Sequence, residues 1–371
     1  MDLLNATNMQ AGYTMGMQPD GRESLVVVVK GTFRIPENGG RPELADEQVP
    51  LVEADEYTGE PGLSAPIYES DYARYKPKCD VILNGSAYAP DGVPVKKVRV
   101  SLTVGSMAKS FNVIGNRFWH KRFGFPRISR PEPFTVMPIT YDVAFGGTDH
   151  THEKPSKHEA FMLNPIGVGF HANQQGKFFK GKPLPNTEEV GKPIKSPTGN
   201  YRPMAFSPVG RGWELRYKLA GTYDQDWIDN VFPFLPSDFQ DAYYQSAPID
   251  QQTDYLKGGE IVKLINLTPQ GQTVFRLPET DVPIVFFLKK GGHHETQAAA
   301  DTLVLEPDLG RFTITWRASL PLKRDMFEVP QVLVGKKSRA WWRARELGKT
   351  YYSSLNELIQ ANQAELEEET E

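Results

Sequence analysis

One polar segment of the sequence carries residue types that bind transition metals. Asp149, His150 and His152 stand close together, and Glu153 and His158 follow shortly after them. Imidazole and carboxylate groups are the usual protein ligands of zinc and iron. The spacing matches no compact metal motif, however, and a metal site also needs surrounding hydrogen bonds that hold its ligands in place. A solvated polar loop is the favoured interpretation, so we predict no metal site.

Two further groups of residues were considered for catalysis. Asp224 and Asp226 flank Gln225 beside Trp227, and such a group can bind a sugar. A glycosidase, however, needs two carboxyl groups about 5–10 Å apart across a cleft, which spacing alone does not establish. Cys79, the single cysteine, opens an apolar strand, where a lone thiol more often packs than reacts.

The sequence also lacks the usual catalytic and nucleotide-binding motifs. It contains no G-x-S-x-G, no H-E-x-x-H and no P-loop, each of which places reactive groups in a defined turn or helix. We therefore predict no catalytic residues, no cofactor and no enzymatic activity. The alternative is a carbohydrate-active or metal-dependent hydrolase. It would use either Asp224 and Asp226, or Asp149, His150 and His152.

The most distinctive aromatic residues lie near the C-terminus. Trp341 and Trp342 stand in a basic stretch, followed by Arg343. Because adjacent positions do not share one face of a helix, we expect the two rings to lie in different environments. Trp and Arg are enriched at binding hot spots, so Trp341, Trp342 and Arg343 are the candidate partner-binding residues. The competing interpretation, which we favour, is that this tail docks onto the protein itself.

Composition excludes several classes of protein. Of the 371 residues, 39% are hydrophobic and 11% aromatic, which is enough for a large core and unlike a disordered chain. The net charge of −4 lacks the basic balance typical of nucleic-acid binding. The N-terminus has no signal-peptide pattern, and no apolar run approaches the roughly 20 residues of a spanning helix. We expect a cytoplasmic protein without a membrane or nucleic-acid partner.

Strand patterns dominate the chain between Pro- and Gly-rich breakers. Residues 1–23 are predicted to be an irregular arm, and Ser24–Ile35 is the first β-branched strand. Within Val95–Val104, apolar residues alternate with polar ones, as in a half-buried strand. Other strands are predicted at Cys79–Ala89, Ser110–Trp119, Phe134–Phe145, Glu260–Leu267, Gln272–Leu277, Val282–Lys289, Thr302–Glu306 and Arg311–Ser319.

Loops and helices complete the predicted architecture. Pro and Gly residues recur through residues 148–211, which are therefore predicted to form loops. The β domain is predicted to span residues 24–335, and if it has two lobes, the boundary between them lies within 148–211. Capping patterns at Ser237 and Ser354 predict two short helices, the second amphipathic and part of a helical tail over residues 336–371. The prediction is a mainly β protein with an antiparallel, sandwich-like scaffold, long loops and few helices.

Seven short motifs occur in an order that resembles a known family. They are Asp80–Pro94, Ile114–Trp119, Pro133–Gly147, Asn164–Phe170, Leu184–Glu188, Trp213–Asp226 and Phe232–Gln252. In this order they resemble the bacterial adaptor, or chaperone, family of type VI secretion systems, a domain of unknown function encoded beside PAAR-like spike-tip proteins and toxins.

The resemblance implies a non-catalytic role. Such an adaptor binds the PAAR-like region of an effector and aids its loading onto the spike for toxin delivery, with the spike protein as a second candidate partner. The motifs contain four polar residues for which we predict a structural role in ion pairs or caps, namely Arg117, Arg216, Asp224 and Asp250.

Overall fold

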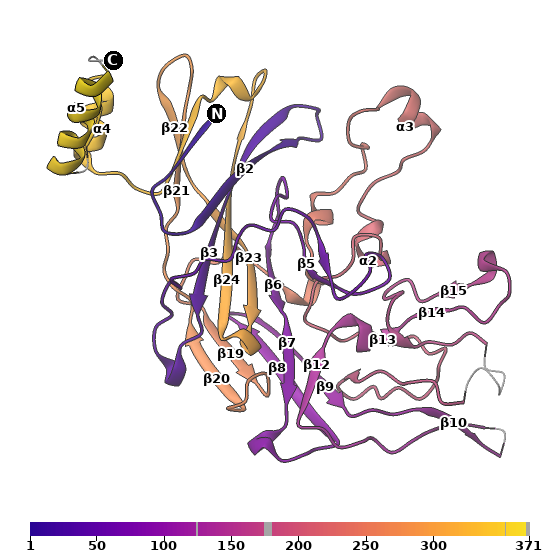
Figure 1. Ribbon diagram of the computed structural model, residues 1–371. Helices are drawn as coiled ribbons and strands as arrows, with labels where there is room; N and C mark the ends of the chain where they lie inside the picture. Colours follow the sequence, from indigo (N-terminus) through magenta and orange to yellow (C-terminus); the bar gives the residue numbers. More distant parts are fainter. Residues whose placement is uncertain (124, 174–179, 353, 369–371) are drawn as a thin grey trace.

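Two large β-sheets form the centre of the protein. The computed structural model describes residues 1–123, 125–173, 180–352 and 354–368 (Figure 1). The first sheet contains, in spatial order, β18 (Gln252–Thr253), β6 (Cys79–Leu83), β23 (Ala299–Glu306), β24 (Arg311–Pro321), β3 (Glu23–Arg34) and β2 (Gln10–Met17). Its strand pairs are antiparallel except β23 and β6, which run parallel.

The second sheet packs on the first and is antiparallel throughout. It contains β17 (Thr187–Glu189), β9 (Met107–Ile114), β8 (Lys97–Val104), β19 (Ile261–Ile265) and β20 (Gln272–Arg276). In β8 every second side chain is buried, as its alternating pattern predicts. Side chains such as Val27, Leu102 and Leu264 from the two sheets belong to one apolar cluster. The predicted sandwich-like, mainly β fold is therefore confirmed.

The other face of the six-stranded sheet is polar but buried. Lys30 of β3 forms an ion pair with Asp71 at 2.8 Å, and Arg317 of β24 pairs with Asp301 of β23 at 2.6 Å. The acidic segment that follows β3 lies over this face and includes β4 (Glu56–Tyr57) and β5 (Pro66–Tyr68). Because buried charges need partners, the Lys30–Asp71 pair fixes the segment onto the sheet, and Arg317 adds hydrogen bonds to the backbone oxygens of Asp71 and Ala73 at 2.7 Å.

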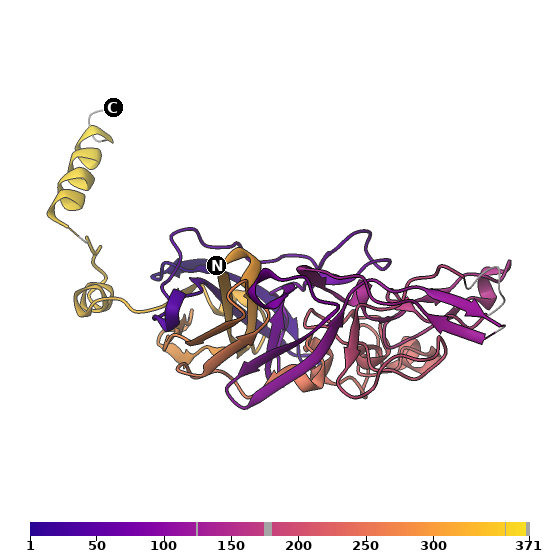
Figure 2. The same cartoon turned by 90° about the horizontal axis from the view of Figure 1, so that it is seen from below.

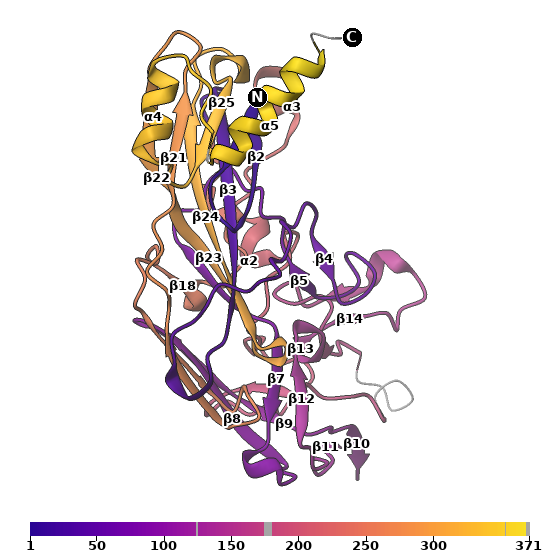
Figure 3. The same cartoon turned by 60° about the vertical axis from the view of Figure 1, so that its left-hand side comes forward.

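A third sheet joins the two ends of the chain. It contains β1 (Asp2–Asn5), β25 (Gln331–Val334), β21 (Pro283–Phe287) and β22 (His293–Gln297), and helix α4 (Arg339–Glu346) lies beside it (Figure 3). The prediction that residues 1–23 are irregular was wrong, since β1 and the whole of β2 lie there. Their sequences lack β-branched alternation, and pairing with β25 and β3 imposes the extended conformation.

Short elements and loops form the rest of the molecule. In the part of the chain that the structure describes, the remaining strands are β7 (Gly85–Tyr88), β10 (Trp119–Arg122), β11 (Phe125–Ile128), β12 (Val136–Ile139), β13 (Phe145–Gly146), β14 (Thr148–Asp149), β15 (Glu159–Ala160) and β16 (Val168–Gly169). The 3-10 turns of the same part are η1 (Glu37–Gly39), η2 (Pro90–Gly92), η3 (Tyr141–Val143), η4 (Pro155–Lys157), η5 (Asp241–Tyr244), η6 (Ile249–Gln251), η7 (Pro307–Leu309) and η8 (Met326–Glu328).

Helices are few, as predicted. Among the described residues they are α2 (Glu214–Tyr217), α3 (Gln225–Asn230), α4 and α5 (Leu355–Glu368), and α5 extends away from the sheets (Figure 2). Ser354 accepts a hydrogen bond from the backbone N–H of Glu357 at 3.2 Å, so the predicted cap of α5 is present. The helix predicted from Ser237 was wrong, because only the 3-10 turn η5 forms there. Among the described helices, none has the length and apolar character needed to cross a membrane.

Candidate functional site

An apolar cleft of about 590 Å³ opens where α2, η5 and η6 meet strand β9. Two apolar side chains in its lining are unusually exposed: Ile249 by 85% and Leu215 by 48%. Apolar groups left in water are unfavourable, and contiguous exposed apolar surface commonly marks a binding site. Its other apolar lining residues include Val209, Leu219, Ala247 and Pro248.

A buried lysine lies in this apolar lining. Lys109 Nζ is 2.6 Å from Gln251 Oε1 and 3.3 Å from Asp250 Oδ1. Arg202 donates from Nη2 to the other oxygen of Asp250 at 2.5 Å. Asp250 therefore links a buried cation to a half-exposed one. Burial lowers the pKa of Lys109 to about 8, because desolvation of the ammonium outweighs the attraction of Asp250.

Buried polar contacts hold one wall of the cleft. Asp80 is fully buried and accepts hydrogen bonds from the backbone N–H groups of Ser246 and Ala247 at 2.8 and 3.2 Å. Lys76 Nζ pairs with the same carboxylate at 2.8 Å. Gln251 Nε2 donates to the backbone oxygen of Val81 at 2.8 Å, which ties η6 to strand β6. The irregular segment before and through η6 is thus fixed to the first sheet.

Arg216 fixes the opposite wall. Its guanidinium donates to the backbone oxygens of Val209 at 2.9 Å and Tyr243 at 2.7 Å, and to Glu69 Oε1 at 2.6 Å. A planar group with five N–H donors suits such a junction of three segments. Arg216 therefore connects α2 to η5 and to the segment after β5.

Two of the four polar motif residues lie in the cleft, and two do not. Arg216 and Asp250 line it. Arg117 is buried elsewhere, where it pairs with Glu188 at 2.8 Å. Asp224 precedes α3 and accepts a hydrogen bond from the backbone N–H of Trp227 at 2.9 Å, which is an N-terminal cap.

The two C-terminal tryptophans contact the protein's own third sheet. The ring centroids of Trp341 and Trp342 lie 6.3 and 5.8 Å from that of Phe287 in β21. The expectation of different environments was wrong, because both rings are half-buried and both contact Phe287, with their own centroids 5.2 Å apart. The Arg345 guanidinium lies 3.6 Å from the centroid of the same ring, while Arg343 is exposed. A partner-binding role for Trp341, Trp342 and Arg343 stays a prediction.

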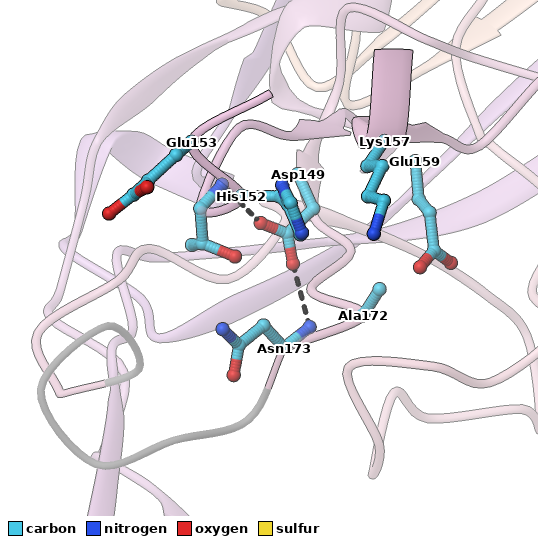
Figure 4. Close-up of a pocket in the computed structure, with 8 residues that line it drawn as sticks. Asp149, His152, Glu153, Lys157, Glu159, Ala172 and Asn173 are labelled. Atoms are coloured by element: carbon cyan, nitrogen blue, oxygen red, sulfur yellow. Dashed lines mark hydrogen bonds between the residues drawn. The ribbon is translucent and has the colours of Figure 1, made fainter. Parts of the chain in front are cut away.

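The histidine-rich segment forms a polar loop around Asp149 (Figure 4). The Asp149 carboxylate accepts hydrogen bonds from the backbone N–H groups of Thr151 at 2.9 Å and Asn173 at 2.7 Å. His150 and His158 contact each other through their Nδ1 atoms at 3.0 Å. The side chain of Glu153 extends away from Asp149 (Figure 4). Within the described part of the chain, no three His, Cys, Asp or Glu residues could hold a metal ion together.

The other residues considered for catalysis have local contacts. Asp226 accepts a hydrogen bond from Asn230 within α3 at 2.8 Å, and both Asp224 and Asp226 are exposed. Cys79 is buried, and burial raises the pKa of its thiol well above the usual range. A buried neutral thiol is a poor nucleophile.

Sequence reasoning missed the residues that give the cleft its charge. Lys109 had a detectable signal, because it alternates with Met107 and Phe111 on the inward face of a strand, where lysine is unusual. Arg202 gave none, since it lies in an irregular segment.

Comparison with known proteins places the chain in one family. No curated protein and no solved structure matches it. Residues 20–317 match the family DUF2169, described as an uncharacterized protein conserved in bacteria. This match includes every residue that lines the cleft, whereas α4 and α5 lie beyond it. Because the match covers well over half of the sequence, the chain belongs to the DUF2169 family.

Proposed function

We propose that this protein is a non-catalytic adaptor that binds the PAAR-like region of a type VI secretion effector and aids its loading onto the spike. In this role it acts in the cytoplasm, before secretion. The proposal is supported by the seven motifs that resemble such adaptors. The observation that carries it is the cleft, because Trp213–Asp226 and Phe232–Gln252, two of these motifs, supply most of its lining.

The chemistry of the cleft suits an apolar client segment. Ile249 and Leu215 stand exposed at the cleft, and full burial of one such side chain contributes about 1.5–3 kcal/mol. Arg202 is half-exposed beside them and can donate to a carbonyl or carboxylate of the client. Because the walls are held by buried hydrogen bonds, little ordering is needed when the client enters.

Co-expression with a PAAR-like type VI effector from the same genome tests the proposal. We expect the tagged protein to retain that effector through size exclusion at micromolar concentration. Ile249→Asp and Leu215→Asp place a charge at the cleft and should abolish retention. Leu309→Asp, a change at an exposed leucine of η7 outside the cleft, is the matched control and should leave retention intact.

Two outcomes contradict the proposal at different levels. If the wild-type protein and the effector elute separately, the adaptor function is wrong. If they elute together and both cleft variants retain the effector as well as Leu309→Asp does, the adaptor function stands and the cleft is not the contact.

A further inference from the structure

A second exposed apolar surface lies beyond the cleft. Residues 219–240, which we call the aromatic loop, leave α2, form α3 and return to η5, and α3 projects from the body of the protein (Figure 1). Four large side chains of this loop are exposed: Tyr223 by 53%, Ile228 by 55%, Phe232 by 66% and Phe234 by 45%. Aromatic side chains at this density are typical of binding surfaces.

The aromatic loop is an ordered structure with contacts of its own. Trp227 lies between Tyr223 and Phe232, with ring centroids 4.8 and 5.5 Å away. Its indole N–H donates to the backbone oxygen of Phe234 at 2.9 Å. A Cβ added at Gly21 would lie 2.8 Å from the Phe234 ring, so this ring packs closely on the turn between β2 and β3. The exposed rings are therefore held in place before any partner binds.

The loop carries charge of a single sign. It contains Asp224, Asp226, Asp229 and Asp238, and no Lys, Arg or His. Asp226 and Asp229 lie on α3 and are exposed beside Ile228. Such a surface repels phosphate groups and attracts cationic side chains. Charge complementarity thus favours a basic protein surface over a nucleic acid or an anionic membrane.

We propose that the aromatic loop is a second docking surface, and that it binds an apolar depression edged by Lys and Arg side chains on the client effector. This inference rests on the proposed adaptor function and names a further contact within it. Leu219 belongs to both the loop and the cleft lining, so the loop begins at the edge of the cleft. One client can therefore occupy the cleft and contact the loop at the same time.

Two double variants separate the apolar and the charged contribution of the loop. Tyr223→Ser with Ile228→Ser removes exposed apolar surface, and we expect the Kd for the purified effector to rise by about tenfold or more. Leu63→Ser with Leu309→Ser, at two exposed leucines outside the loop, is the control and should leave the Kd unchanged. Circular dichroism melting confirms that each variant is folded.

Asp226→Asn with Asp229→Asn removes two charges and retains the Asp224 cap. Because complementary charge accelerates association and is screened by salt, we expect slower association and a weaker dependence of the rate on NaCl concentration. Glu60→Gln with Glu153→Gln removes two exposed charges elsewhere and should retain the wild-type dependence. Biolayer interferometry at two salt concentrations measures both rates.

The outcomes distinguish this inference from the adaptor proposal. If the wild-type protein binds no client, both are overturned. If it binds the client and Ile249→Asp abolishes binding, while both loop variants match their controls in Kd and salt dependence, only the loop inference is overturned. A loss in the apolar variant together with a flattened salt dependence in the charge variant supports it.

Discussion

The buried ammonium of Lys109 gives the most specific prediction. Lys109→Met replaces it with an uncharged, unbranched side chain and leaves Asp250 paired with Arg202. In the folded protein the pKa of Lys109 is lowered to about 8 from its ordinary value of 10.5, because burial penalises the charged form. Keeping this group protonated at pH 7 therefore costs free energy, which the methionine variant avoids.

The sign of the pH dependence follows from proton binding. Between pH 8 and 10.5 the unfolded chain carries a proton on Lys109 that the folded protein has lost, so wild-type stability rises with pH in this window. The two pKa values correspond to a difference of about 3 kcal/mol. Below pH 8 the full penalty is present, and it is relieved as the pH rises through the window.

Urea unfolding of the wild type and Lys109→Met at pH 7, 8, 9 and 10 measures this contribution. We expect the free energy of unfolding of the wild type, relative to the variant, to rise by up to about 1.4 kcal/mol per pH unit above pH 8. Other titrating groups contribute equally to both proteins and cancel. Lys263→Met, at an exposed position of β19, should give no such slope relative to the wild type. A difference between wild type and Lys109→Met that is constant from pH 7 to 10 would refute the reasoning.

Three further predictions concern contacts that hold the fold. Asp80→Ala leaves Lys76 as an unpaired buried charge and should lower the free energy of unfolding by about 3–5 kcal/mol in urea titration; an unchanged midpoint would contradict this. Gly115→Ala places a Cβ 1.8 Å from the backbone oxygen of Glu132, so we expect a melting temperature lower by several degrees. An unaltered melting temperature would contradict this and show that the backbone around Glu132 shifts without strain. Trp342→Ala weakens the packing of α4 on the third sheet, and trypsin should cleave within α4 roughly tenfold faster while the urea midpoint of the sheets stays the same; equal cleavage would contradict the docking role.

The strands of the two large sheets could be predicted because their signals are local. Alternating side chains in β8 and the β-branched run in β3 reflect burial that each strand experiences along its whole length. The helix predicted to begin at Ser237 does not form, although the sequence has the capping pattern there. The backbone oxygen of Tyr243, within that segment, binds Arg216 instead, and this long-range contact favours the 3-10 turn. Local helix propensity is overridden where a buried charged side chain needs the backbone group as its hydrogen-bond partner.

The cleft could be anticipated only in part. Most of its lining lies in two motifs that the sequence displays, and Arg216 and Asp250 are polar members of those motifs. The two cations that pair with Asp250 are Lys109, from a strand, and Arg202, from a distant irregular segment. No spacing rule connects residues so far apart in the chain, and only the packing of the two sheets brings them to one carboxylate.

The segment around the cleft has little regular secondary structure, so its position must come from elsewhere. Asp80, Arg216 and Gln251 hold it in place, because each side chain is buried and bonds two backbone groups, most of them in irregular segments. A collapsed cleft would break these hydrogen bonds and leave several buried polar groups unsatisfied at once, which raises the free energy of the collapsed state. The cleft therefore stays open in the free protein, with Ile249 exposed and Lys109 held in an apolar setting. This arrangement stabilises the unoccupied shape of the cleft, which the proposed binding of a client requires.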